Sequence, residues 1–129
     1  MIQITPHVRI LLALEPVDFR KGIDGLCRVC REEIQNDPFS GAFFIFMNRQ
    51  RIALRLLSYD GQGFWLCHKR LSSGRFRSLG ARSGSRVKAL GALELQTLLW
   101  NGDFGKADCG PLFRPIRAGY RLQDKEFGL

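Results

Sequence analysis

Four aspartates are the candidates for metal-dependent chemistry in this chain of 129 residues: Asp18, Asp24, Asp37 and Asp60. Clustered carboxylates hold the divalent ions that nucleases and DNA-strand-transfer enzymes use. Each of the four also has a structural interpretation, as a helix cap at Asp18, a first-turn acid at Asp24, a turn residue at Asp37 and a hairpin turn at Asp60. We therefore rank a metal-dependent, nuclease-like activity third among the functions considered.

Cysteine and histidine offer a second kind of chemistry. Cys67 and His68 are neighbours, but adjacent strand residues point to opposite faces, so they cannot form a simple nucleophile–base pair. Cys27 and Cys30 have the spacing of a metal or redox motif. They fall in a predicted helix, and the chain has only two histidines to complete a tetrahedral zinc site. We interpret both as core residues, and we predict no cofactor, no metal site and no enzymatic activity.

Positive charge is the strongest chemical signal. The net charge is +8, and residues 49–88 hold ten lysines and arginines against a single acid, Asp60. A localised field of this kind attracts polyanions, with nucleic acid first and an anionic membrane surface second. The alternative is a solvated face that keeps the protein soluble. No apolar run approaches the ~20 residues of a membrane span, and no secretion signal is visible, so we expect a cytoplasmic protein with free thiols.

Hydrophobic periodicity indicates the elements that position these groups. Apolar runs predict strands at 8–14 and 42–47, and the second run is continuous enough to be covered on both faces. Helical spacing predicts helices at 20–35 and at about 90–101. Residues 72–76 are predicted to turn into a short basic strand, followed by a basic loop to residue 86.

Residues 51–71 are predicted to form a hairpin around Asp60-Gly61. Either a two-residue or a four-residue loop places even positions of the first strand on one face with odd positions of the second. One face, predicted to be core, consists of Ile52, Leu54, Leu56, Trp65, Cys67 and Leu71. The other consists of Arg51, Arg55, Leu57, Tyr59, Phe64, Leu66, His68 and Arg70. This mixture is typical of sheets that bind single strands or RNA, or it forms a second core face with a charged rim.

The fold class predicted from these elements is α+β. We expect a single small domain over residues 1–104, with an antiparallel sheet of about four or five strands and two flanking helices. Residues 105–129, which show no clear periodicity, are predicted to be a C-terminal extension that is flexible unless it packs on a partner.

Five short motifs occur in order along the chain: PVDFRKGIDGL (16–26), DPFSG (37–41), YDGQG (59–63), HKRL (68–71) and GRF (74–76). Together with LGALELQTLLWNGDF (90–104), they resemble the small accessory protein of insertion-sequence-66-type bacterial transposons, the second-frame product of the element. The resemblance covers about residues 16–104. It implies a gene carried beside a DDE-type transposase and needed for efficient transposition, with no established catalytic activity. The chain departs from the family pattern at Arg77-Ser78, where Trp-Pro is usual, and at Gly91, where a Ser or Thr cap is usual.

The first functional hypothesis is a non-enzymatic accessory factor that binds DNA through the basic hairpin face. The residues expected to contact phosphates are Arg20, Lys21, Arg49, Arg51, Arg55, Lys69, Arg70, Arg75 and Arg77. Arg20 and Lys21 have a second interpretation, in which they only flank a cap at Asp18. Tyr59 and Phe64 are candidates for base stacking if they are exposed. The second hypothesis is a protein adaptor that binds the transposase or a sister accessory protein.

Overall fold

The apolar segment FFIFM forms β2 (Phe43–Met47), and all five of its side chains are buried. The strand order β4-β3-β2-β1-β5 places β2 in the middle of a five-stranded sheet. A strand buried on both faces reads as a continuous hydrophobic run, so the prediction of a doubly covered central strand is confirmed. The structure is a computed structural model, and it describes residues 7–77 and 85–100.

The other strands are β1 (Ile10–Ala13), β3 (Ala53–Tyr59), β4 (Phe64–Arg70) and β5 (Val87–Leu90). β1 pairs with β2 in parallel, and the remaining three pairs are antiparallel. A parallel neighbour requires a crossover connection, which here carries the helix between β1 and β2. The α+β class is therefore confirmed, with a sheet that is mostly antiparallel and contains one parallel pair.

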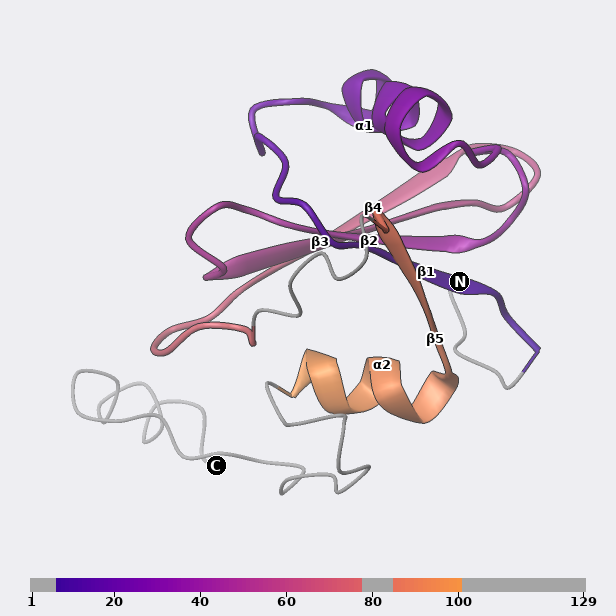
Figure 1. The fold of residues 1–129 in the computed structure, drawn as a ribbon. Helices are drawn as coiled ribbons and strands as arrows, with labels where there is room; N and C mark the ends of the chain where they lie inside the picture. The colour runs from indigo at the N-terminus through magenta and orange to yellow at the C-terminus, as the bar shows by residue number, and fades with distance from the viewer. Residues whose placement is uncertain (1–6, 78–84, 101–129) are drawn as a thin grey trace, which may run out of the picture.

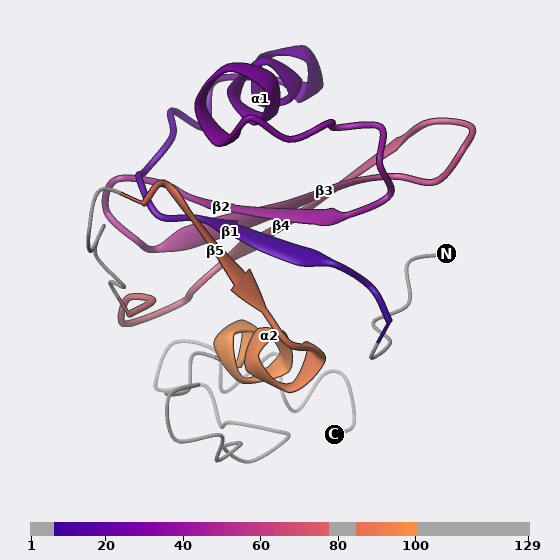
Figure 2. The ribbon, with the colours of Figure 1, turned by 45° about the vertical axis from the view of Figure 1, so that its right-hand side comes forward.

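Helices cover both faces of the sheet (Figure 1). α1 (Ile23–Val29) continues directly into the π-helical segment η1 (Cys30–Ile34) on one side. α2 (Ala92–Leu99) lies on the opposite side, as Figure 2 shows from a second direction. The helices predicted at 20–35 and 90–101 are thus present with shorter limits.

Two apolar cores result, one on each side of the sheet. The core beneath α1 consists of Leu11, Ala13, Leu26, Cys27, Val29, Cys30, Ile34, Ala42, Phe44, Phe46 and Leu57. The core beneath α2 consists of Ile10, Leu12, Phe43, Ile45, Met47, Leu54, Leu56, Phe76, Leu90, Leu95 and Leu98. Alternate residues of β2 enter opposite cores, as the two-residue period of a strand requires. Cys27 and Cys30 are core residues, as predicted, and burial raises the pKa of the Cys30 thiol to about 12.

The hairpin forms in the register with a four-residue loop, so that Tyr59 lies opposite Phe64. Leu57 is fully buried in the core beneath α1 and Leu66 packs against it. The face predicted to mix aromatic and basic groups is therefore, in this part, a second core face. It faces α1, whose position the hairpin sequence alone does not reveal.

Two residues of the predicted core face are exposed, and that prediction was wrong. Trp65 is 42% exposed, and Cys67 is also exposed. The core beneath α2 takes buried residues from β1, β2, β3 and β5 but none from β4. Since β4 is an edge strand, its α2-facing side lies at the margin of that core.

Two further differences concern the segment after the hairpin. β5, at 87–90, was not predicted as a strand; it is short and is buried only at Leu90, so its sequence carries little periodicity. The short basic strand expected to follow the turn in 72–76 is not formed in the described part of this segment, where residues 75–77 adopt no regular structure. The buried ring of Phe76 anchors this segment instead, and its N–H donates to the Arg51 carbonyl over 2.7 Å. Most of the predicted basic loop (78–84) and the predicted extension (105–129) lie outside the described residues.

Replacing Phe44 by Ala should lower the free energy of unfolding by about 3–5 kcal/mol, because a fully buried ring on the central strand leaves a cavity. Chemical denaturation measures the change. Leu93→Ala, at an exposed position of α2, is the control and should change the stability by less than about 0.5 kcal/mol. Equal effects of the two substitutions would contradict the assignment of β2 as the centre of the core.

Candidate nucleic-acid interface

The hairpin turn is held by the carboxylate of Asp60. Its Oδ1 accepts hydrogen bonds from the backbone N–H groups of Gln62 (2.8 Å) and Gly63 (3.0 Å). Its Oδ2 accepts one from the indole Nε1–H of Trp65 at 2.7 Å. These donors lower the pKa of Asp60, the backbone groups of Gln62 and Gly63 most strongly. Both oxygens of Asp60 thus serve the turn, in agreement with its structural interpretation.

Asp18 does not cap the first helix, which corrects the sequence-based interpretation. α1 begins at Ile23, with Gly22 as the N-cap and no side-chain hydrogen bond to the cap. Instead, Asp18 accepts hydrogen bonds from the backbone N–H of Arg20 (2.9 Å) and from its guanidinium (2.7–3.1 Å). This paired arrangement with Arg20 lowers the pKa of Asp18 to about 2. The guanidinium of Arg20 therefore has a local partner, although its side chain is 91% exposed.

Asp37 also has a turn function, because its Oδ1 accepts a hydrogen bond from the backbone N–H of Phe39 at 2.9 Å. Within residues 7–77 and 85–100, no three His, Cys, Asp or Glu side chains lie close enough together to hold a metal ion. Asp18, Asp37 and Asp60 thus serve separate turns, and Asp24 lies in the first turn of α1.

Arg55 braces the segment before α1 against the sheet. Its Nε donates to His68 Nδ1 and its Nη1 donates to the Lys21 carbonyl, both at 3.1 Å. The guanidinium carbon lies 4.6 Å from the centre of the Phe19 ring, in cation–π contact. Arg55 was predicted to contact phosphates, but in this structure its guanidinium is already engaged by three protein groups.

Lys69, also a predicted phosphate contact, lies on the side of β4 that faces α2. Its ammonium donates a hydrogen bond to the carbonyl of Leu99, the last residue of α2. A cation at a helix C-terminus is favourable because the last carbonyls carry partial negative charge. Lys69 therefore links the edge of the sheet to α2.

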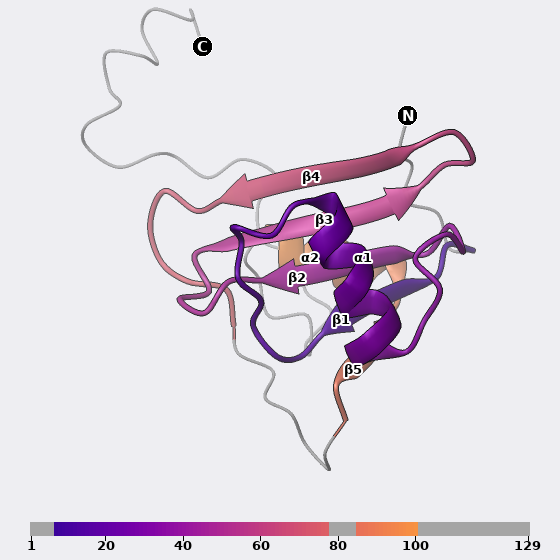
Figure 3. The same cartoon turned by 90° about the horizontal axis from the view of Figure 1, so that it is seen from above.

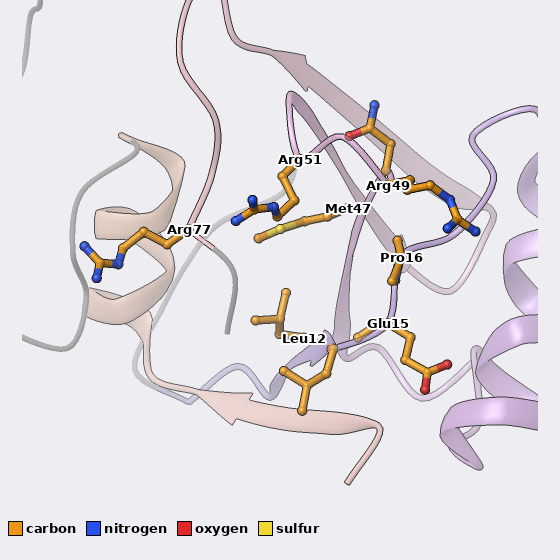
Figure 4. A pocket seen from close by; sticks show the side chains of 10 residues that line it. Leu12, Glu15, Pro16, Met47, Arg49, Arg51 and Arg77 are labelled. Carbon is orange, nitrogen blue, oxygen red and sulfur yellow. The ribbon is translucent and has the colours of Figure 1, made fainter. Parts of the chain in front are cut away.

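Three arginines line one pocket at the end of the sheet where the parallel strands β1 and β2 finish. The pocket has a volume of about 170 Å³, and Arg49, Arg51 and Arg77 contribute to its lining. Its apolar lining comes from Leu12, Ala13, Leu14, Pro16 and Met47. Figure 4 shows the side chain of Arg51 beside Met47, with Arg49 and Arg77 on opposite sides of it. Among the described lining residues, Glu15 is the only acid, and its carboxylate points away from Arg51 in this view.

The loop that carries these arginines has a defined conformation. Asn48 Oδ1 accepts hydrogen bonds from the N–H groups of Ile52 (3.1 Å) and Ala53 (3.3 Å). Arg51 has a φ of 59°, in the left-handed region that non-glycine residues seldom adopt. Its Nη1 donates to the Phe76 carbonyl at 3.3 Å. Arg51 therefore joins the loop to the segment that places Arg77 at the pocket.

A second cavity of about 680 Å³ adjoins the first and shares Arg49 with it. Residues 16–20 line its other side, so Arg20 lies on the same side of the molecule. Arg70 lies opposite Ala53, the first residue of β3, at the same end of the sheet. Arg75 is exposed and adjoins Phe76. We call the set Arg20, Arg49, Arg51, Arg70, Arg75 and Arg77 the basic end of the sheet.

The two aromatic residues predicted to stack on bases lie at the other end of the hairpin. Tyr59 and Phe64 are six residues along their strands from the basic end, or about 20 Å. Their rings lie 5.0 Å apart and contact Phe39 at 4.9 Å and 5.1 Å. Tyr59 and Phe64 are half-buried, whereas Phe39 is 53% exposed. Sequence reasoning missed Phe39, whose signal was its place inside the turn DPFSG.

The fold and this site define a small α+β protein with a basic, arginine-lined end. A family model described as IS66 Orf2-like protein matches residues 8–107. The chain therefore belongs to the IS66 Orf2-like family, which associates it with the transposition of an insertion sequence and confirms the resemblance seen in its motifs.

Two relatives come from Sinorhizobium fredii, and both are uncharacterized proteins. The protein y4jC is 31% identical over 117 residues, which cover 91% of this chain and 98% of y4jC. The protein y4hO is 31% identical over 113 residues, covering 88% of this chain and 95% of y4hO. No solved structure matches the chain. Among the described residues, no helix is long and apolar enough to cross a membrane.

Replacing Asp60 by Ala should lower the melting temperature at pH 7, because three donors of the hairpin turn lose their acceptor. The pKa of Asp60 is lower in the folded protein, so its contribution is present above the ordinary aspartate pKa of about 4 and is lost as the pH falls through the folded-state value. Circular dichroism melts between pH 7 and pH 2 should show the difference between wild type and variant shrinking in acid. A difference independent of pH would contradict this role, and Glu32→Ala, at an exposed position of η1, serves as the control.

Proposed function

We propose that this protein is a non-enzymatic accessory factor for transposition that binds DNA phosphates at the basic end of its sheet. The observation that carries the proposal is that Arg49, Arg51 and Arg77 all line the same pocket. Guanidinium groups form strong, charge-assisted hydrogen bonds with phosphate and match its geometry in pairs. All three arginines contribute to the lining of one pocket, which supports the binding of an anion there.

The position of the pocket also supports anion binding. Loops at the carboxyl ends of parallel strands are common ligand sites in α/β sheets, and here the loops after β1 and β2 both line the pocket. Arg20 and Arg49 border the adjoining cavity, which is also lined by Asp18, the partner of Arg20. A DNA backbone that passes this end would meet several cations in succession, which is the arrangement that gives salt-dependent binding.

The proposal changes which cations are expected to matter. The hairpin residues Arg55 and Lys69 hold the segment before α1 and the end of α2, respectively. Their replacement would disturb the fold as well as the charge. Arg49 and Arg77 are exposed and lie at the pocket, so they are the more direct probes of DNA contact.

The double variant Arg49→Gln with Arg77→Gln should bind DNA more weakly than wild type, and its affinity should depend less on salt. Each phosphate contact contributes about 0.9 to the slope of log affinity against log salt for duplex DNA. We expect the slope to fall by about 1 for each arginine removed. Fluorescence anisotropy on duplex and single-stranded DNA from the ends of the element, titrated at several salt concentrations, measures both quantities.

Arg28→Gln with Arg31→Gln is the matched control, because both arginines are exposed on α1 and η1 and the variant has the same net charge. Equal loss of binding in the two variants would show that only net charge matters, and the pocket would have no special role. Wild-type protein that binds neither form of DNA would overturn the proposal altogether.

The adaptor hypothesis remains the second candidate, and the exposed ring of Phe39 favours it. Large exposed aromatic side chains are enriched where proteins meet one another. An adaptor would co-purify with the transposase after nuclease treatment. Phe39→Ala should then abolish co-purification, whereas the Arg49 and Arg77 substitutions should leave it intact.

A further inference from the structure

The outer edge of β4 has no strand partner among the described residues. β4 is the terminal strand of the sheet, and within residues 7–77 and 85–100 no other strand pairs with its far side (Figure 3). The strand is seven residues long, and Trp65 on it is 42% exposed. A long edge strand with free backbone groups is a template for pairing with another strand.

The hydrogen bonds at the two ends of the hairpin show which backbone groups point outward. Asp60 N–H donates to the Gly63 carbonyl at 3.0 Å, and Leu71 N–H donates to the Ile52 carbonyl at 2.8 Å. Both belong to the register that pairs β3 with β4. Because hydrogen-bonded pairs alternate along an antiparallel ladder, the odd residues of β4 bond to β3. The outward N–H and C=O groups are therefore those of Phe64, Leu66, His68 and Arg70.

We propose that a second copy of this chain pairs with this edge, antiparallel, about a twofold axis at Cys67. In that register Phe64 pairs with Arg70 of the second copy, and Leu66 pairs with His68. All four outward residues then find hydrogen-bonding partners. An axis at Leu66 would set Arg70 opposite Gln62, which lies before the strand. An axis at His68 would set Phe64 opposite Ser72, which lies after it.

Side-chain chemistry favours the same register. It sets Trp65 opposite Lys69 and Phe64 opposite Arg70, so that each cation faces an aromatic residue rather than another cation. Like charges directly opposite one another destabilise a strand pair, whereas aromatic rings attract cations. An axis at His68 would place the two His68 side chains against each other. The free edge and the side-chain order therefore select the same pairing, which makes one ten-stranded sheet from two five-stranded ones.

The size of the contact sets the expected strength. Two seven-residue edges bury less than the ~1,200 Å² of a standard stable interface. We expect a dimer with a dissociation constant in the micromolar range or weaker. The inference concerns the edge of β4 and does not depend on DNA binding at the basic end.

Disulfide trapping tests the register. Cys67 of one copy lies opposite Cys67 of the other, at a non-hydrogen-bonded position of the ladder. Cα atoms at such positions are about 4.5 Å apart, which is within the range that a disulfide spans. Cys27 and Cys30 are buried, and Cys109→Ser removes the remaining thiol. Mild oxidation of this variant should give a covalent dimer on a non-reducing gel.

The register control uses variants that also carry Cys67→Ser. Trp65→Cys alone should not cross-link, because the two positions 65 would lie about 14 Å apart along the strands. Trp65→Cys combined with Lys69→Cys should cross-link, with circular dichroism confirming that both variants are folded, because Trp65 and Lys69 also contact Asp60 and Leu99. Cross-linking of Trp65→Cys alone, or none in any variant, would overturn the proposed axis.

A proline substitution tests the edge itself. The N–H of His68 points outward and is not used in pairing with β3, so His68→Pro removes one intermolecular donor and is compatible with an edge strand. His68→Ala is the matched control, since both variants lose the contact between His68 and Arg55. Sedimentation across a concentration series should show dimerisation of His68→Ala, weakened at least about tenfold in His68→Pro, or ~1.4 kcal/mol. Equal association of the two folded variants would contradict the proposal.

Hydrogen exchange of the wild-type protein identifies the occupant. Protection of the Leu66 and His68 amides that rises with protein concentration supports pairing between copies. Protection that is independent of concentration would mean that another segment of the same chain covers the edge, and fast exchange at every concentration would mean that the edge stays free. Either of these results overturns the proposal.

Discussion

The burial of β2 on both faces explains how the other elements are arranged. Its five apolar residues point alternately to the two faces of the sheet, and exposing either face to water would be unfavourable. One helix therefore covers each face. α1 does this through the connection between β1 and β2, which makes that pair parallel. α2 does it from a later segment, which follows β5 after that strand has paired with the other side of β1. One mixed sheet between two helices follows from this single requirement.

The parallel pair also determines where the arginines gather. Both strands finish at the same end of the sheet, so the loops that follow them lie together and form the pocket. The left-handed conformation of Arg51 and its two hydrogen bonds with Phe76 bring a third segment to the same place. Cations from two separate stretches of sequence, residues 49–51 and residue 77, therefore lie together where β1 and β2 end.

Local pattern was sufficient for much of the fold. The period of the apolar residues predicted β1, β2, both helices and the hairpin, because each element buries a face that its own sequence displays. It failed where burial depends on a distant partner. Trp65 and Cys67 alternate as core residues should, yet the core beneath α2 includes no residue of β4. β5 was missed because its sequence shows no apolar period. A short strand that pairs only with β1 needs little apolar sequence of its own.

Motifs, periodicity and charge are local properties of the chain, so they were enough to predict the family resemblance, the α+β class and the forty-residue window that holds the excess charge. Which cations lie together depends on how the elements pack in space, and the sequence did not reveal it. The tertiary structure assigned Arg55 and Lys69 to structural contacts, separated Tyr59 and Phe64 from the basic end, and joined Arg49, Arg51 and Arg77 around one pocket. The physical reason is that hydrogen bonding and burial depend on neighbours in space, which a linear spacing of charges does not contain.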